Sequence, residues 1–217
     1  MNLPPLQVAQ TRAGRLGYIV SGSGKPHIVL VNGAGMSLEG WEALYPDIEQ
    51  LGTVFAYNRL GIKGSDAAGQ PQSGAVIVAT LRELLAYAGL EPPCVLVGHS
   101  LGCLYVDLFA RLHPGETAAM LLVEPTLPDE PADLREREGE FAHGTSKALG
   151  LPQPMLEANL HLELASLEIT LQQLRSAGPR PPVPCRVLHA RGHFPQLSQP
   201  GVVLRELASI ATAAAAG

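Results

Sequence analysis

The stretch Gly98-His99-Ser100-Leu101-Gly102 decides the fold because of the runs that flank it. The apolar run Cys94–Val97 precedes it and predicts a strand, and Leu101–Leu112 follows it and predicts a helix. Glycines on both sides of the serine permit a sharp turn between the two elements, in which an added Cβ would crowd the backbone. Such a turn lifts the Ser100 hydroxyl clear of the sheet and puts the Leu101 amide at a helix N-terminus, where it can donate to an oxyanion. The stretch therefore predicts a nucleophilic serine; the alternative is a tight turn whose serine has no chemical role.

Outward from this turn, short apolar runs alternate with longer amphipathic ones, a pattern typical of an α/β fold. Five short and nearly continuous apolar runs predict strands covered on both faces, as in a parallel sheet. These runs are His27–Val31, Thr53–Tyr57, Cys94–Val97, Ala119–Val123 and Cys185–His189. Two alternating runs, Leu6–Thr11 and Arg15–Ser21, predict an antiparallel edge hairpin. The expected helices are Leu38–Leu51, Ser73–Ala88, Leu101–Leu112 and Val202–Ala214. The fold class is therefore α/β, with a mostly parallel, doubly wound sheet.

One long segment breaks this alternation. It holds a charged helical run, Asp129–Glu140, then a leucine-rich run, Met155–Leu174, and it closes on the Gly- and Pro-rich stretch 178–184. Insertions between two strands of a sheet commonly form caps over active sites. We therefore expect a core made of residues 1–126 and 185–217, with a small helical cap at 127–184.

The composition bounds the class of protein. With 217 residues, of which 46% are hydrophobic and 16% charged, the chain has the size and core of one globular domain. The formal net charge is −5, with only 15 Lys and Arg residues and no basic run, which argues against a nucleic acid or an anionic membrane as partner. We expect a small neutral or weakly polar molecule instead. The sequence does not indicate an oligomeric state.

No segment has the pattern of a targeting signal or a membrane span. Residues Met1–Pro5 lack a basic and an apolar region, and no apolar run approaches the roughly 20 residues that a span needs. Three cysteines, an odd number without C-x-x-C spacing, predict small buried side chains rather than a zinc site or a disulfide framework. They are Cys94, Cys103 and Cys185. We therefore expect a cytoplasmic protein without a cofactor or a metal.

Together with these patterns, the turn at Ser100 resembles the nucleophile elbow of the α/β-hydrolase superfamily, and the resemblance runs along almost the whole chain. Val31-Asn32-Gly33-Ala34-Gly35-Met36 looks like the family's oxyanion loop after the third strand, usually His-Gly-x, with Asn32 in place of the His. The resemblance implies that the Ala34 amide is the second oxyanion donor beside Leu101; the alternative is a plain turn. The stretch Asn58 to Asp66 is similar to the family's D-x-x-G-x-G-x-S turn, and we assign it only a structural role.

The same resemblance implies a general base near the C-terminus. Gly192-His193-Phe194-Pro195-Gln196-Leu197-Ser198-Gln199-Pro200 is close to the family's G-H-F-P-Q-L-x-x-P stretch, so His193 is the candidate. The six other histidines fall in expected strands, helices, the elbow or the cap, where we expect packed or surface residues. They are His27, His99, His113, His143, His161 and His189.

The acid of the triad is where the chain departs from the family. Members usually carry an Asp after the strand that follows the cap, then a helix and one more strand before the His. Here Cys185–His189 leads almost at once to His193, and no Asp follows Asp133, so we expect a sheet about one strand short. The best substitute is Glu124, directly after the preceding strand, a sheet position where some relatives, including a group of haloalkane dehalogenases, place a carboxylate. It would hold the His193 ring in the correct tautomer. Three alternatives stay open: Glu124 only bonds its loop, a cap carboxylate such as Asp129 is the acid, or the site is a Ser–His dyad.

A serine at this position sets the reaction class. Haloalkane dehalogenases and epoxide hydrolases need an Asp nucleophile, whereas Ser100 implies an acyl-enzyme formed at a carbonyl. We expect a carboxylesterase-like serine hydrolase of small or medium acyl groups, because the cap is rich in leucine and poor in aromatic residues. Lactones, thioesters, amides and activated C–C bonds are alternative substrates, and acyl transfer is an alternative outcome. A non-enzymatic binder of a small molecule with the same fold, or an inactive or domain-swapped fragment, are the competing interpretations.

Overall fold

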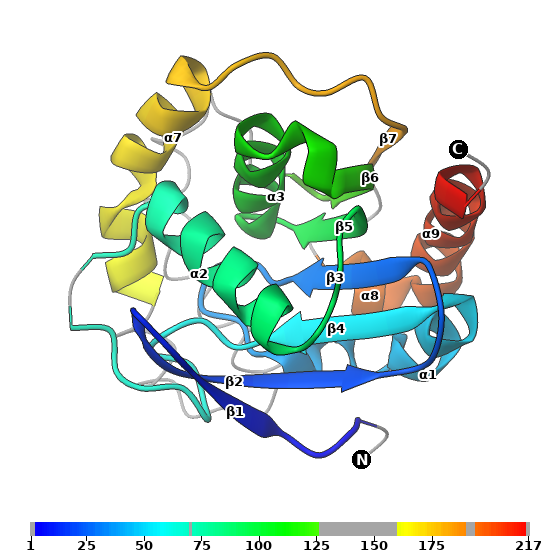
Figure 1. Ribbon diagram of the computed structural model, residues 1–217, viewed down its shortest axis with the longest axis horizontal. Helices are drawn as coiled ribbons and strands as arrows, with labels where there is room; N and C mark the ends of the chain where they lie inside the picture. Colours follow the sequence, from blue (N-terminus) through cyan, green and yellow to red (C-terminus); the bar gives the residue numbers. More distant parts are fainter. Residues whose placement is uncertain (1–2, 70, 126–159, 190–193, 216–217) are drawn as a thin grey trace.

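The computed structural model describes residues 3–69, 71–125, 160–189 and 194–215 (Figure 1). Seven strands in these ranges form one sheet. They are β1 (Gln7–Thr11), β2 (Gly14–Ser21), β3 (His27–Val31), β4 (Thr53–Tyr57), β5 (Cys94–His99), β6 (Thr117–Val123) and β7 (Cys185–Leu188). Their order across the sheet is β1-β2-β4-β3-β5-β6-β7. The hairpin β1–β2 is antiparallel, β2 also runs antiparallel to β4, and every pair from β4 to β7 is parallel. The expected α/β fold is confirmed.

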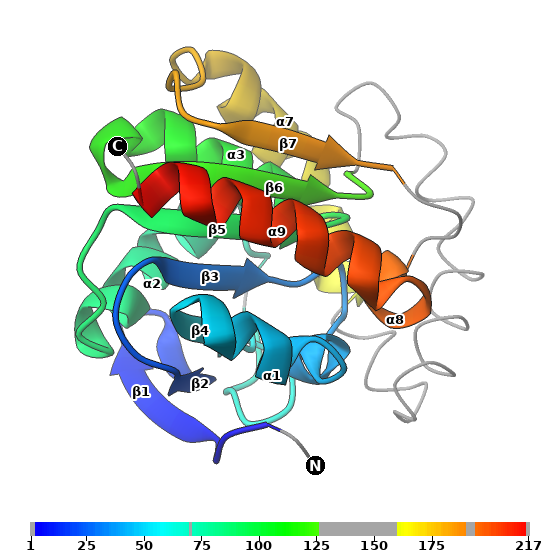
Figure 2. The same cartoon turned by 90° about the vertical axis from the view of Figure 1, so that its right-hand side faces the viewer.

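Helices cover both faces of the sheet. On one face lie α2 (Gly74–Tyr87), α3 (Gly102–Leu112) and α7 (Leu167–Ser176), and on the other lie α1 (Tyr45–Ile48) and α9 (Pro200–Ala215), as Figure 2 shows. The connecting short helices are η1 (Leu38–Trp41), η2 (Glu49–Leu51), η3 (Pro114–Glu116) and α8 (Pro195–Ser198). Two apolar clusters fill the layers between the helices and the sheet. Because the parallel strands are buried on both faces, they read as continuous apolar runs in the sequence.

The expectation of one helix over Leu38–Leu51 is wrong, since the segment forms the three short pieces η1, α1 and η2. Pro46 is the physical reason. A proline has no backbone N–H and its ring collides with the preceding turn, so a helix can begin at a proline but cannot run through it. Accordingly α1 begins at Tyr45 with Pro46 in its first turn. Trp41 and Tyr45 are fully buried and hold the broken segment on the core.

The sheet ends at β7, so it is shorter than the family pattern, as expected. Between Pro184 and His189, the described residues contain this single strand. Of the predicted cap, residues 160–165 are helical and continue into α7, which packs against α2 and α3. The charged run Asp129–Glu140 lies outside the described residues, and the domain limits stay a prediction. Within the described ranges, no helix combines the length and apolar character that a bilayer crossing requires.

Candidate active site

The turn after β5 has the geometry of a nucleophile elbow. Strand β5 extends to His99, two residues beyond the expected end, and α3 begins at Gly102, so Ser100 occupies the turn with φ of +50°. A Cβ at Gly98 would lie 2.7 Å from the Cys103 Cα, and one at Gly102 would lie 2.6 Å from the Asn32 carbonyl oxygen. A serine with positive φ is uncommon and strained. The two glycines therefore allow a close backbone approach that forces the serine into this conformation.

The loop 32–36 lies directly beside the serine. A Cβ built on Gly33 would come within 3.2 Å of the Ser100 Cβ. Ala34 and Leu101 are both buried, and no acceptor among the described residues receives a hydrogen bond from either backbone N–H. Buried N–H groups without an acceptor are rare in native structures. In the described part of the chain, the turn and the loop thus hold two backbone donors without an acceptor close to one serine.

Glu124 occupies the corresponding turn on the neighbouring strand. The register pairs His99 with Val123, so Ser100 and Glu124 are the next residues along two adjacent parallel strands. They are also the two non-glycine residues with positive φ in the described part of the chain, at +50° and +46°. The Ser100 N–H donates to the Val123 carbonyl at 2.9 Å, and the Glu124 N–H donates to the Leu188 carbonyl at 2.9 Å. Backbone bonds thus hold the ends of β5, β6 and β7 together at one edge.

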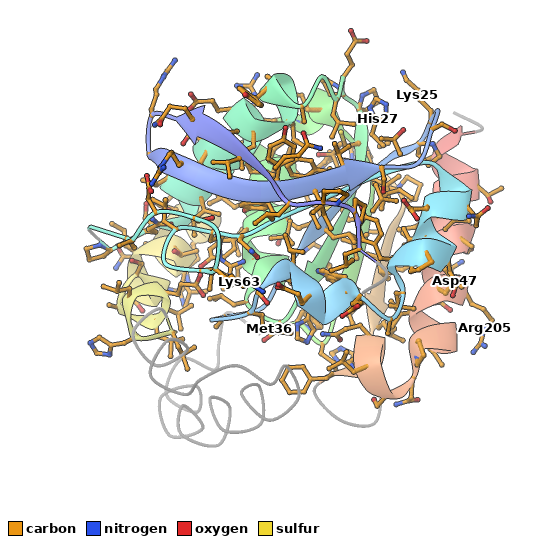
Figure 3. The ribbon with its side chains drawn as sticks, turned by 90° about the horizontal axis from the view of Figure 1, so that it is seen from below. Lys25, His27, Met36, Asp47, Lys63 and Arg205 are labelled. Carbon is orange, nitrogen blue, oxygen red and sulfur yellow. The ribbon has the colours of Figure 1, made fainter. Side chains whose placement is uncertain are left out.

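The predicted base, His193, lies outside the described residues, as does Asp129, and their roles stay predictions. Phe194, the residue after the base, is described. Its ring centroid lies 5.6 Å from that of His99, which immediately precedes the serine. Figure 3 shows another histidine, His27, well apart from Met36, the last residue of loop 32–36; His27 begins β3, whereas the loop follows the other end of that strand. His27 therefore lies away from the candidate site.

A buried ion pair next to this loop was not predicted from the sequence. Arg59 Nε lies 2.6 Å from Glu163 Oε1, and Arg59 Nη2 lies 3.0 Å from Glu163 Oε2. The exposed fractions of the two side chains are 3% and 4%. Arg59 also donates to the carbonyl oxygens of Asn32 and Gly33, at 2.8 and 2.6 Å, and Glu163 accepts from the Gly35 N–H at 2.8 Å. The pair therefore binds three backbone groups of the loop directly.

One sequence signal could have found Glu163. The buried leucines at positions 160, 167, 171 and 174 repeat at helical spacing, and position 163 falls on the same face. A carboxylate on an apolar helix face needs a buried partner. Nothing equivalent marks Arg59, which stands in a turn whose glycines suggested a structural role alone.

The surroundings of this pair are buried and aromatic. Burial by itself lowers the pKa of Arg59, but the Glu163 carboxylate outweighs it and raises that pKa above its ordinary value. The guanidinium carbon lies 5.4 Å from the centre of the Tyr105 ring. Burial raises the pKa of Tyr57 to about 12 and raises the pKa of Tyr105 as well. At neutral pH the guanidinium is therefore charged and both phenols are neutral.

The chain matches the family described as alpha/beta hydrolase fold over residues 26–150, more than half of its length. It belongs to that family.

Curated proteins similar to this chain match part of its length. The uncharacterized protein YqjL of Bacillus subtilis is 33% identical over 108 residues, which cover 50% of this chain and 43% of that protein. The chain spans less than half the length of the curated relatives it matches.

Solved structures show the same fold. An alpha/beta hydrolase fold protein from Burkholderia ambifaria superposes with a TM-score of 0.76 at 16% identity, covering 94% of this chain and 98% of that one. The carboxylesterase CesB from Bacillus subtilis gives 0.68 at 15% identity, covering 95% and 90%. A thermophilic esterase from Thermogutta terrifontis gives 0.70 at 16% identity, covering 95% and 97%. At such low identity the likeness concerns the fold.

Proposed function

We propose that this chain is a serine hydrolase that cleaves a small-molecule carbonyl substrate, above all a carboxylic ester of a small or medium acyl group, through an acyl-enzyme on Ser100. One observation carries the proposal. The strained turn at Ser100 lies beside two buried backbone donors, the N–H groups of Ala34 and Leu101, that have no acceptor among the described residues. An unused pair of donors beside a serine suits a substrate whose carbonyl oxygen becomes negatively charged.

The reaction follows from these groups. Ser100 Oγ attacks the carbonyl carbon, and His193 takes the hydroxyl proton as general base. The Ala34 and Leu101 N–H groups donate to the oxyanion of the tetrahedral intermediate, an effect worth about 3–4 kcal/mol for one donor. Collapse expels the alcohol, which receives the proton from His193. Water then attacks the acyl-enzyme by the same steps and releases the acid.

The roles of His193 and Glu124 rest on position. Phe194, which directly follows the proposed base in the sequence, packs against His99 beside the elbow, and this contact supports the assignment. Glu124 follows the strand next to β5, at the edge where parallel strands end and where α/β sheets place their ligands. A carboxylate there would orient the imidazole and stabilise its cation.

The nature of the substrate is also part of the proposal. Two of the similar structures are described as a carboxylesterase and an esterase, which favours an ester. The net charge of −5 and the absence of a basic run favour a neutral or weakly polar small molecule. The three cysteines without C-x-x-C spacing suit a cytoplasmic location, which is also part of the proposal.

Two measurements test the proposal. A fluorophosphonate should label the wild type at one site per chain, because the reaction needs an activated serine, and it should not label Ser100→Ala. A panel of p-nitrophenyl esters of rising chain length should show turnover that falls by at least about 10³-fold in the same variant. Labelling without ester turnover would shift the substrate to another carbonyl class. A wild type that neither labels nor turns over would contradict the hydrolase and leave the non-enzymatic binder.

A further inference from the structure

We propose that Arg59 and Glu163 are positioning residues that orient the Ala34 N–H toward the reacting carbonyl, and that they thereby couple the loop 32–36 to the packing of residues 160–176. The inference rests on the proposed function, because it concerns a donor of the same oxyanion site. Neither side chain is assigned a step in the chemistry.

The peptide bonds on both sides of Ala34 carry the argument. The Gly33 carbonyl and the Ala34 N–H belong to one planar, trans peptide, so they point in opposite directions. Arg59 Nη2 donates to the Gly33 oxygen at 2.6 Å and so fixes the direction of the Ala34 N–H. The next peptide is fixed at its N–H, because Gly35 donates to Glu163 Oε2 at 2.8 Å. One ion pair thus holds the peptide planes on both sides of Ala34, one of which contains the proposed donor.

The loop needs such support because of its glycines. Gly33 and Gly35 have no Cβ to restrict their backbone, and Gly35 has φ of +63°. Within the loop, the Met36 N–H donates to the Gly33 oxygen at 3.3 Å, a longer bond than those from Arg59. The side-chain bonds are short, charge-assisted and buried, and bonds of this kind are about twice as strong as neutral ones.

Glu163 brings the coupling to the helical segment. It belongs to the helical residues 160–165, which continue into α7 through buried Leu167. Helix α7 is itself fixed on α2, where Thr170 Oγ1 accepts from the Gly74 N–H at 2.9 Å. The carboxylate can therefore reach Gly35 only when this segment is packed in place.

Asp107 offers a matched control for a merely structural role. This α3 carboxylate is also buried, and it accepts hydrogen bonds from Arg111 at 3.0 Å and from Arg180 at 2.8 Å. The bond from Arg180 joins residues 160–184 to the core, as the bonds of Glu163 do. Of the two carboxylates, only Glu163 with its partner Arg59 binds loop 32–36. Asp107→Asn therefore weakens a comparable ion pair with Arg180 without affecting the proposed donor.

The first experiment compares the steady-state kinetics of Glu163→Gln, Arg59→Lys and Asp107→Asn on the best p-nitrophenyl ester. Lysine keeps the charge at position 59 but cannot bond both carbonyls and the carboxylate together. We expect kcat to fall about 100-fold or more in both pair variants, the scale of losing one oxyanion donor, with KM within about threefold. In the control, Asp107→Asn, the melting temperature should fall about as far as in the pair variants, but kcat should stay within about threefold of the wild type. Equal kcat losses in all three would overturn the proposal.

The second experiment does not depend on turnover. Hydrogen exchange by mass spectrometry on the peptide spanning loop 32–36 should be at least about tenfold faster in Glu163→Gln and Arg59→Lys than in the wild type and Asp107→Asn. Unchanged exchange in both pair variants would overturn the positioning role whether or not the wild type hydrolyses esters. Faster exchange with unchanged kcat would overturn it too. If the wild type neither labels nor hydrolyses, the proposed function fails, and exchange alone decides whether the pair orders the loop.

A double variant covers the case in which Glu163→Gln does not fold. Arg59→Met with Glu163→Met leaves no unpaired buried charge, and replacing a buried ion pair by apolar side chains is often tolerated. Positioning predicts that the double variant folds and still loses about 100-fold in kcat. Wild-type kcat in the folded double variant would assign the pair a structural role only.

Discussion

The two loops that meet beside Ser100 are held in place by different means. The elbow is fixed by close backbone packing, because Gly98 lets β5 approach the start of α3, and Gly102 lets α3 approach the carbonyl groups of Val31 and Asn32. The loop 32–36 is fixed by side chains from far along the sequence. Arg59 is 26 residues from Gly33, and Glu163 is 128 residues from Gly35. Local changes should therefore disturb the elbow, whereas distant ones should disturb the loop.

The largest effect is expected at Glu124, which combines a turn backbone like that of the elbow with a proposed role for its side chain. Its backbone has positive φ like that of Ser100, yet its proposed role belongs to its side chain. Glu124→Gln would keep the shape and hold the His193 ring in the wrong tautomer, so kcat should fall by up to about 10⁴-fold. Kinetics across pH are the measurement, with partial recovery at high pH if hydroxide replaces the base. A variant within about threefold of the wild type would favour a Ser–His dyad.

Adding a single methyl group to a glycine of the elbow should strongly lower the stability of the protein. Gly102→Ala would drive a Cβ into the carbonyl oxygens of Val31 and Asn32. We expect the free energy of unfolding to fall by about 3 kcal/mol, at the upper end of the cost of overpacking, as measured by urea denaturation. Gly115→Ala is the control, because its Cβ would meet nothing within 4 Å, and it should change stability by less than about 1 kcal/mol. Equal effects of the two substitutions would mean that close packing does not hold the elbow.

Helix α3, which follows the elbow, is held both by a neighbouring and by a remote side chain, Arg111 and Arg180, which bind Asp107. Its expected effect is intermediate in size. Burial by itself raises the pKa of Asp107, but hydrogen bonds from Arg180 and Arg111 outweigh it and lower that pKa. Asp107→Asn should cost about 1–2 kcal/mol at pH 7, because Arg180 is partly exposed. The lowered pKa means that this stabilisation is complete above the unfolded value of about 3.9 and is lost as the pH falls through the folded value.

Urea midpoints of the wild type and Asp107→Asn, measured from pH 7 to pH 2, check this dependence. The difference between the two proteins should be constant down to about pH 4 and should shrink below it. A difference that stays the same at pH 2 would rule out the charged bonds as its source.

The smallest effect isolates the strain at the serine. Ser100→Gly and Ser100→Ala both remove the hydroxyl, but only glycine adopts φ of +50° without cost. The glycine variant should be more stable by about 1 kcal/mol, which corresponds to roughly 2–4 °C in melting temperature for a chain of this size. Identical melting temperatures would show that the backbone of the elbow stores no strain.

The same division explains what could be predicted from the sequence. The parallel strands and the elbow were placed correctly because apolar runs and glycine spacing act within a few residues. The helix over Leu38–Leu51 was wrong because Pro46 weighs more than the apolar pattern around it. The Arg59–Glu163 pair was missed because its two members meet only through the tertiary fold. His193 stays a prediction of the resemblance, and Glu124 one of its position after β6.

The separation between Arg59 and Glu163 also has a consequence for biosynthesis. The two residues are 104 positions apart, and ribosomes add about 5–20 residues per second, so about 5–20 s pass between their syntheses. Ser100 is made during this interval, before the carboxylate that completes the loop exists. Under the proposed function, a nascent chain would carry Ser100 for seconds before the carboxylate that supports loop 32–36 exists, and it would reach full activity only after the segment 160–176 has left the ribosome and packed.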